Sequence, residues 1–531
     1  MKQGNIAHTK LYNLVMLHLD SPDNQKINID PYHYNEENFD PILFHELLIN
    51  VRLILENEKP SVNNMNSMGV DVACRIIIEI CALLEANKQG KITDIQKKLF
   101  LLNYLTVDMD KQINKSMPDE LRELLQNPYD KVIKDYQTLL GCSRAQAEQV
   151  NSERYSFLKY GGKTYSGWSS FIKTILGEEF VEYREMLNMF IHPAYTDTKI
   201  TYFDEKLEDD RKKIINRILT LASSNIPELV NNDYVKSKWN DEYIDADNLE
   251  RIKLIKKAFK ETFKHNHNDE KWQNTSLEDD NTRYMAFSCF KKLGSTLIDM
   301  LICESLGLRN QTIIRVKSFA EMTSMLGVLI RCEDIDGIFD DFIRVSALFI
   351  TNKHKNYYEV FNKVDSGNQL TENEEKNIYE PYLDFIRAWY PHFKDHHDYP
   401  DSEEEFATNI RRYPLYFIEQ DTHYKYSRLV EDTVNIYIEN QRTRIQINSD
   451  YKWSSRVGHA CAYKSQYKEN KSFNVLPNLI TYLLKVFEDI YTVIEGAQFI
   501  DDMETLANDL RKMYKQNYDD KMGSKYKALE E

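Results

Sequence analysis

One stretch of the chain, residues 70–87 (VDVACRIIIEICALLEAN), is apolar on nearly every side when it is drawn as a helix. A surface helix carries its apolar residues as a stripe, so a helix that is apolar all round must be surrounded by other elements. No glycine or proline interrupts the segment. It therefore predicts a central helix that several neighbouring elements cover.

The neighbouring segments also have helical periodicity. Apolar residues recur at helical spacing in 41–60, 169–191, 204–224 and in several segments beyond residue 284. The 531 residues include only 16 glycines and 13 prolines, which are the main residues of tight turns and hairpins. The sequence therefore predicts an all-α fold.

The length of the chain exceeds what one hydrophobic core usually serves, which favours more than one domain. Apolar residues become scarce and Asn, Asp and His accumulate over 264–283, which we interpret as a linker. This divides the chain into a helical bundle at 1–263 and a second at 284–500. Residues 501–531 are expected to form a C-terminal helix and a frayed tail.

Charge and composition limit the classes of partner. The formal net charge of −16 argues against a broad nucleic-acid-binding surface, because such surfaces need clustered Lys and Arg, but a local pocket for RNA stays open. The N-terminus lacks the apolar core of a secretory signal, and no apolar run is long enough to span a membrane. We expect a cytoplasmic protein, with a protein partner or a homo-oligomer left open.

The seven cysteines are scattered and include no CxxC pair, which indicates reduced buried thiols rather than disulfides or a zinc site. Motifs of nucleotide-binding, α/β-hydrolase and zinc-protease enzymes are also missing from the sequence. We therefore expect no cofactor and no metal.

Two helices share a basic-x3-acidic pair. Arg75 and Glu79 lie one turn apart in the apolar helix of the first half, and Lys317 and Glu321 repeat the spacing in the second half. Such pairs are commonly intrahelical ion pairs or ties between helices. Their repetition on an apolar helix in each half is the first sign that the halves are related.

A histidine segment follows each pair. VEYREMLNMFIHPAY (181–195) carries Tyr183 nine places before His192, and YKWSSRVGHACAY carries Tyr451 eight places before His459. Each histidine is followed by another Tyr within four residues. The shared order of features predicts a tandem duplication, with chance similarity between two helical halves as the alternative.

These features resemble an uncharacterised bacterial family of helical bundles that is suspected of roles in stress or phage defence. That family combines an Arg-x3-Glu helix with a later Tyr-x2-Ser-x3-His-like helix. Tyr451, Ser454 and His459 match the second pattern with the histidine one place late, whereas Tyr183 and His192 match it without a serine. The resemblance covers about half of the chain.

The chain is more distantly similar to the HEPN superfamily, helical bundles that include ribonucleases with an Arg-x4-6-His motif, often Arg-Asn-x3-His. Asn188 and His192 supply Asn-x3-His, but Leu187 stands where the adjacent arginine belongs, and Arg184 lies one turn earlier. In the second half, Arg456 lies three residues before the histidine. The resemblance implies a site at these positions in each half.

Other polar segments carry weaker signals. Arg387 and His392 have the strict Arg-x4-His spacing, but Pro391 should interrupt the helix that this motif requires. The segment 395–398 (DHHD) lacks a frame that would direct its side chains at one ion. The acidic segment at 365–375 resembles a calcium loop only in composition.

The first functional hypothesis is a metal-independent endoribonuclease of the defence or toxin type. Its chemistry needs a histidine to move a proton and an arginine to face the phosphate, roles open to His192, His459, Arg184 and Arg456, with Asn188 orienting them. The alternative is a non-catalytic helical scaffold that binds a protein or small ligand between its halves. In that reading His192 caps a helix end.

Overall fold

A computed structural model gives the structure of the chain. It describes residues 3–20, 37, 39–65, 67–102, 130–131, 133–153, 155–191, 205–227, 246–267, 281–331, 360, 363–364, 366–380, 383–384, 387, 390, 402–405, 407, 426–457, 475–490 and 497–530.

Helices make up the regular structure of these described residues, which contain no strand, and the predicted all-α fold is confirmed. None of the described helices is long and apolar enough to cross a membrane. The α-helices are α1 (Gln3–Leu19), α3 (Phe39–Glu58), α4 (Met68–Lys88), α7 (Arg144–Ser152), α8 (Ser156–Lys159), α9 (Trp168–Ile175), α10 (Glu178–Ile191), α12 (Glu205–Ser224), α13 (Ala246–His267), α15 (Asn281–Ser305), α16 (Arg309–Arg331), α19 (Glu372–Glu374), α23 (Tyr426–Tyr437), α24 (Gln441–Val457), α25 (Val475–Ile490) and α26 (Ala497–Glu530).

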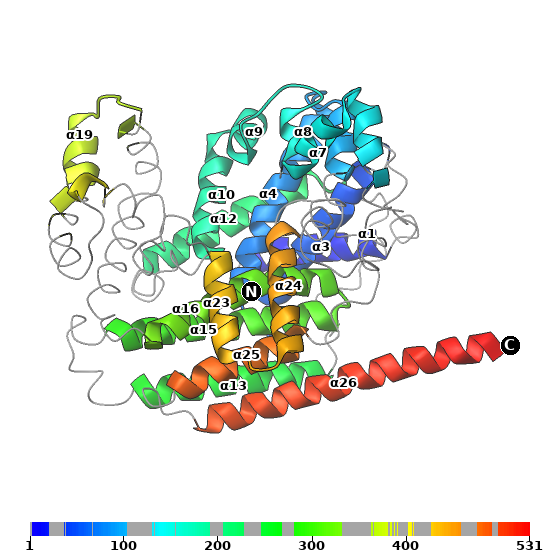
Figure 1. Cartoon of the computed structure of the whole chain (residues 1–531), viewed down its shortest axis with the longest axis vertical. Coiled ribbons are helices and arrows are strands. Elements are labelled where there is room, and N and C mark those ends of the chain that lie inside the picture. The colour runs from blue at the N-terminus through cyan, green and yellow to red at the C-terminus, as the bar shows by residue number, and fades with distance from the viewer. Residues whose placement is uncertain are drawn as a thin grey trace.

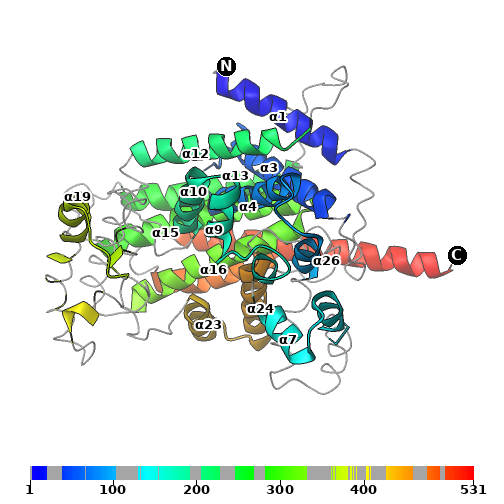
Figure 2. The same ribbon diagram turned by 90° about the horizontal axis from the view of Figure 1, so that it is seen from above.

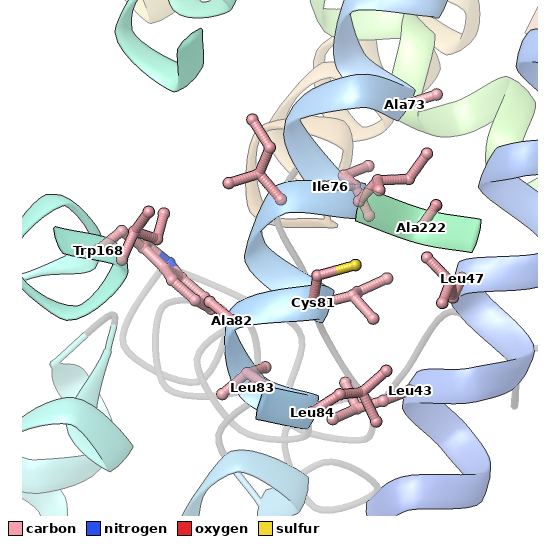
Figure 3. Close-up of a cluster of buried hydrophobic side chains, with 14 of the residues drawn as sticks. Leu43, Leu47, Ala73, Ile76, Cys81, Ala82, Leu83, Leu84, Trp168 and Ala222 are labelled. Carbon is pink, nitrogen blue, oxygen red and sulfur yellow. The ribbon is translucent and has the colours of Figure 1, made fainter. Parts of the chain in front are cut away.

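Helix α4 is the central helix of the first half, as its all-round apolar character predicts. It packs against α3, α9, α10 and α12, and also against α15 and α16 of the second half (Figure 1). Ile76 and Leu83 are fully buried, and Figure 3 shows Leu47 of α3, Trp168 of α9 and Ala222 of α12 around this helix. The Ser67 side chain caps its start by accepting a hydrogen bond from the backbone N–H of Val70.

Helix α16 has the same role in the second half. It packs against α15, α23, α24 and α25, and its Phe319, Met322 and Leu326 are fully buried. Helix α26 covers α25 and α13 through its first part, where Met503 and Leu510 are buried. In both overall views the C-terminal part of α26 extends past the other helices (Figures 1 and 2).

The helix boundaries differ from those expected from the sequence in the linker, in the first bundle and in the C-terminal tail. Helix α13 continues to His267, inside the expected linker, and α15 begins at Asn281. The sequence predicts that residues 246–263 belong to the first bundle, but Ile255 and Phe259 of α13 belong to the core of the second half. Periodicity shows that a helix has an apolar face but not which core that face joins. Helix α26 runs to Glu530 through the residues expected to fray.

The two halves meet at a closely packed seam, where α15 packs against α3 and α4 and α16 packs against α4. Ile314 of α16 joins the hydrophobic core of the first half, and Val62 and Met68 join that of the second. Each core is thus completed by residues of the other half.

Candidate functional site

A buried ion pair joins the central helix of the first half to the helix that precedes His192. Arg184 of α10 donates from Nε to Oε1 of Glu79 in α4 at 3.0 Å. Glu79 is fully buried, and Arg184 is 7% exposed. A second bond runs from Arg184 Nη1 to the half-exposed Glu185 at 3.2 Å. The charge of Arg184 is therefore matched by the buried carboxylate of Glu79 and by the half-exposed carboxylate of Glu185.

A buried hydrogen bond joins the corresponding helices of the second half. The hydroxyl of Tyr451 in α24 donates to Oε1 of Glu321 in α16 at 2.8 Å, and both side chains are buried. Burial, followed by the charge of Glu321, raises the pKa of the Tyr451 hydroxyl, which keeps it a donor. Ser454 is also buried, and its hydroxyl donates to the Tyr451 carbonyl at 2.8 Å.

The two ties occupy matching positions in the sequence. Glu79 and Glu321 are the acidic members of the two basic-x3-acidic pairs, and Arg184 and Tyr451 each lie eight residues before a motif histidine. The similarity of the sequence segments had aligned Tyr183 with Tyr451. Tyr183 instead donates to Glu179 on its own helix at 2.6 Å, and burial together with this bond raises its pKa to about 12.

The remaining predicted residues are described to different extents. Arg75 is buried in α4, and Lys317 is partly buried in α16. The backbones of Asn188 and Arg456 lie in α10 and α24. The residues outside the described part of the chain are His192, His459, His392, Asp395, His396, His397 and Asp398.

The weaker polar segments have local structural roles where the structure describes them. Arg387 is exposed and pairs with Asp384 at 3.1 Å. In the segment that resembled a calcium loop, Glu374 forms a capping box with Thr371 at the start of α19. Hydrogen bonds from Lys363 and Thr371 lower the pKa of Glu374 to about 2.

Sequence reasoning did not identify a polar cluster at the seam. Asp299 of α15 forms a buried ion pair with Arg315 of α16 and accepts a hydrogen bond from Asn57 Nδ2 of α3 at 2.6 Å. Arg315 is 1% exposed and also donates to the carbonyl of Gly69 in α4 at 3.3 Å. In the sequence these residues are single polar residues or a glycine within apolar helices. Nothing near them in the sequence shows which residues they contact.

A third buried ion pair anchors the start of α4. Arg211 of α12 contacts Asp71 with Nε at 2.9 Å and donates to the carbonyl of Ser67 at 3.2 Å. Both charged side chains are buried. The aspartate lies in the first turn of α4, where a negative charge also complements the helix dipole.

Four cysteines are described as free thiols, of which Cys142 is half-buried. Cys74, Cys81 and Cys303 are buried and unpaired with one another, and burial raises the pKa of each thiol. Within the part of the chain that the structure describes, no group of three or more His, Cys, Asp or Glu side chains could hold a metal ion.

Comparisons with protein-family models, with curated proteins and with solved structures found no match to this chain.

Proposed function

We propose that the chain is a metal-independent endoribonuclease of the HEPN-like type, in which His192 and His459 transfer protons. The observation that supports this proposal is the repeated buried tie, from Glu79 to Arg184 and from Glu321 to Tyr451. Each tie fixes a helix at a residue that lies eight positions before its histidine in the sequence. Reactive side chains need such rigid support from the elements that carry them.

The proposed reaction uses the 2′-hydroxyl of the RNA as nucleophile. One histidine accepts the proton of this hydroxyl as its oxygen bonds to phosphorus, and the other donates a proton to the 5′-oxygen as the P–O5′ bond breaks. The products are a 2′,3′-cyclic phosphate and a 5′-hydroxyl. A fixed cation is needed beside the phosphate while negative charge builds on it.

Arg184 acts in this proposal as a positioning residue. Its guanidinium is buried and paired with Glu79, so it has little charge to offer to a phosphate outside the bundle. We assign the phosphate-facing cation to Arg456, three residues before His459. Asn188, four residues before His192, is assigned the role of orienting that histidine.

The second proposal is a non-catalytic scaffold that binds a protein or small ligand. The observation that favours it is the burial of the described motif residues Glu79, Arg184, Glu321, Tyr451 and Ser454. In this proposal the polar residues hold the helices together, and the histidines cap the ends of α10 and α24. The contact between α3/α4 and α15/α16 is already filled, so such a ligand would have to bind elsewhere between the halves.

The two proposals differ in their prediction for histidine variants of the full chain. For a ribonuclease, His192→Ala and His459→Ala should each slow RNA cleavage by about 10²- to 10⁴-fold, the usual contribution of general acid–base catalysis. His45→Ala, which changes a partly buried histidine of α3, is the control and should cleave at the wild-type rate. His192→Ala and His459→Ala should melt close to the wild-type temperature. Wild-type cleavage rates in these two variants would contradict the ribonuclease proposal.

A further inference from the structure

The helices of the two halves follow one order and pack on their central helices in the same sequence. Helices α1, α3 and α4 pack in succession, as do α13, α15 and α16. Helices α9, α10 and α12 then pack on α4, just as α23, α24 and α25 pack on α16. Six helices of the first half therefore have counterparts in the second, in the same order along the chain.

The correspondence also holds at the level of single residues. Asn281, the first residue of α15, lies 242 positions after Phe39, the first residue of α3. Glu321 lies the same 242 positions after Glu79, on the next helix of each half. One register thus relates α3 to α15 and α4 to α16, although the connecting loops differ in length.

Counterpart residues meet each other at the seam. Asn57 and Asp299 are separated by the same 242 positions, and their side chains form the buried hydrogen bond of 2.6 Å. In an interface between two copies, a residue contacts its own counterpart only where a two-fold axis passes close to it. Two halves related by a translation, or by a screw along the chain, would not bring these positions together.

A two-fold axis also requires contacts in reciprocal pairs. Asn64 donates to the carbonyl of Ser295 at 3.0 Å. The counterparts of these residues at the same separation are Leu306 and Leu53, and both belong to one small apolar cluster at the seam. The reciprocal pair therefore lies in one cluster at the seam, as a two-fold axis requires, beside the self-contact of Asn57 and Asp299.

We infer that the seam is an internal two-fold dimer interface, so that the chain is two copies of one bundle joined covalently. The partner for the α3/α4 surface of one copy is the equivalent surface of the other, α15/α16. Because the copies are joined in one chain, the residues on the two sides of the axis can differ. Asp299 faces Asn57, and Arg315 has Ala73 as its counterpart. In a dimer of identical chains the carboxylate would face a second carboxylate and be repelled.

The inference makes Arg184 and Tyr451 equivalent, and exchanging them in the full chain tests this. Arg184→Tyr should let a hydroxyl reach Glu79, and Tyr451→Arg should give Glu321 an ion pair, because each substitution introduces the residue that bonds the equivalent glutamate in the other half. Each exchange should lower the melting temperature by less than half as much as the corresponding leucine variant, Arg184→Leu or Tyr451→Leu. Tyr183→Leu is the control for the neighbouring position and should cause only a small loss.

An experimental structure of the full chain tests the axis itself. Superposing α3, α4 and α10 on α15, α16 and α24 should require a rotation close to a half-turn. A rotation far from a half-turn would overturn the dimer-like interface. Exchanged variants that melt no higher than the leucine variants would overturn the equivalence of the halves. Neither measurement depends on ribonuclease activity.

Discussion

At the scale of single residues, three ion pairs inside the helical cores join helices that lie far apart in the sequence or meet at the seam. Glu79 with Arg184, Asp71 with Arg211 and Asp299 with Arg315 each combine a buried carboxylate with a buried guanidinium. Removing one member of such a pair leaves an uncompensated charge, which costs more than losing an exposed pair. These residues therefore fix how the helices fit together more than they add net stability.

Arg211→Leu should destabilise the protein by about 3–5 kcal/mol, because it leaves the buried Asp71 without its partner. Arg217→Leu on the same helix is the matched control, since the Arg217–Glu179 pair is about half exposed. This control should cost at most about 1 kcal/mol. Urea denaturation followed by circular dichroism measures both, and equal losses would contradict the structural role given to Arg211.

Asp450 should make stability depend on pH. Burial raises the pKa of its carboxyl to about 7, and it accepts a hydrogen bond from Gln446. An unfolded aspartate ionises near pH 3.9, so between about pH 4 and 7 the folded state binds more protons, and the free energy of unfolding falls as pH rises. The slope is up to about 1.4 kcal/mol for each pH unit in this window.

Asp450→Asn keeps the acceptor oxygen and removes the ionisation, so it should flatten this dependence and stabilise the protein above about pH 7. Melting temperatures measured from about pH 6, above the isoelectric point of about 5.4, to pH 8 give the comparison. The exposed Asp501→Asn should keep the wild-type profile. Parallel profiles for Asp450→Asn and wild type would show that the carboxyl does not ionise in this range.

At the scale of helices, the seam depends on the close approach of α4 to α15 and α16. Gly69 lies in the first turn of α4, and a Cβ at this position would overlap the Asp299 carboxylate and the Arg315 guanidinium. In an ordinary helix, replacing glycine by alanine stabilises by about 1 kcal/mol. Here the overlap should reverse that sign.

Gly69→Ala should therefore lower the melting temperature of the full chain. Gly167→Ala, at the start of α9, is the control, because a Cβ there meets no other atom. It should leave the melting temperature within a few degrees of wild type. A stabilised Gly69→Ala variant would mean that α4 does not approach the buried ion pair.

Helix identity could be predicted because it depends on local spacing. The all-round apolar segment at 70–87 indicated a central helix, and α4 is buried on nearly every side. Which helices pack together depends instead on contacts far apart in sequence. Ile255 and Phe259 give α13 an apolar face, but nothing local shows that this face joins the second core.

The candidate site was predictable in part for the same reason. Glu79 and Glu321 could be selected because they are acidic residues in apolar helices. Their partners lie more than a hundred residues later, and one is an arginine where the other is a tyrosine. Aligning the two tyrosines, Tyr183 and Tyr451, therefore did not identify Arg184 as the counterpart of Tyr451. The alignment is wrong by one position, which on a helix is a rotation of about 100°.

At the scale of the whole molecule, the two halves form one unit because each contributes residues to the hydrophobic core of the other. Ile314 completes the first core, Met68 the second, and Asn57 and Asp299 meet between them. This arrangement fixes α10 and α24 relative to each other through α4 and α16. Such rigidity is what a composite site with one histidine from each half would need.

The proposed cleavage of RNA by His192 and His459 is tested most directly by the chemistry of the product ends. The purified full chain is incubated with single-stranded RNA in excess EDTA, and the ends of the fragments are identified by mass spectrometry. The proposal predicts cleavage that leaves 2′,3′-cyclic phosphate and 5′-hydroxyl ends, because the attacking group is the 2′-hydroxyl of the RNA. Intact RNA, or fragments ending in a 3′-hydroxyl, would contradict it.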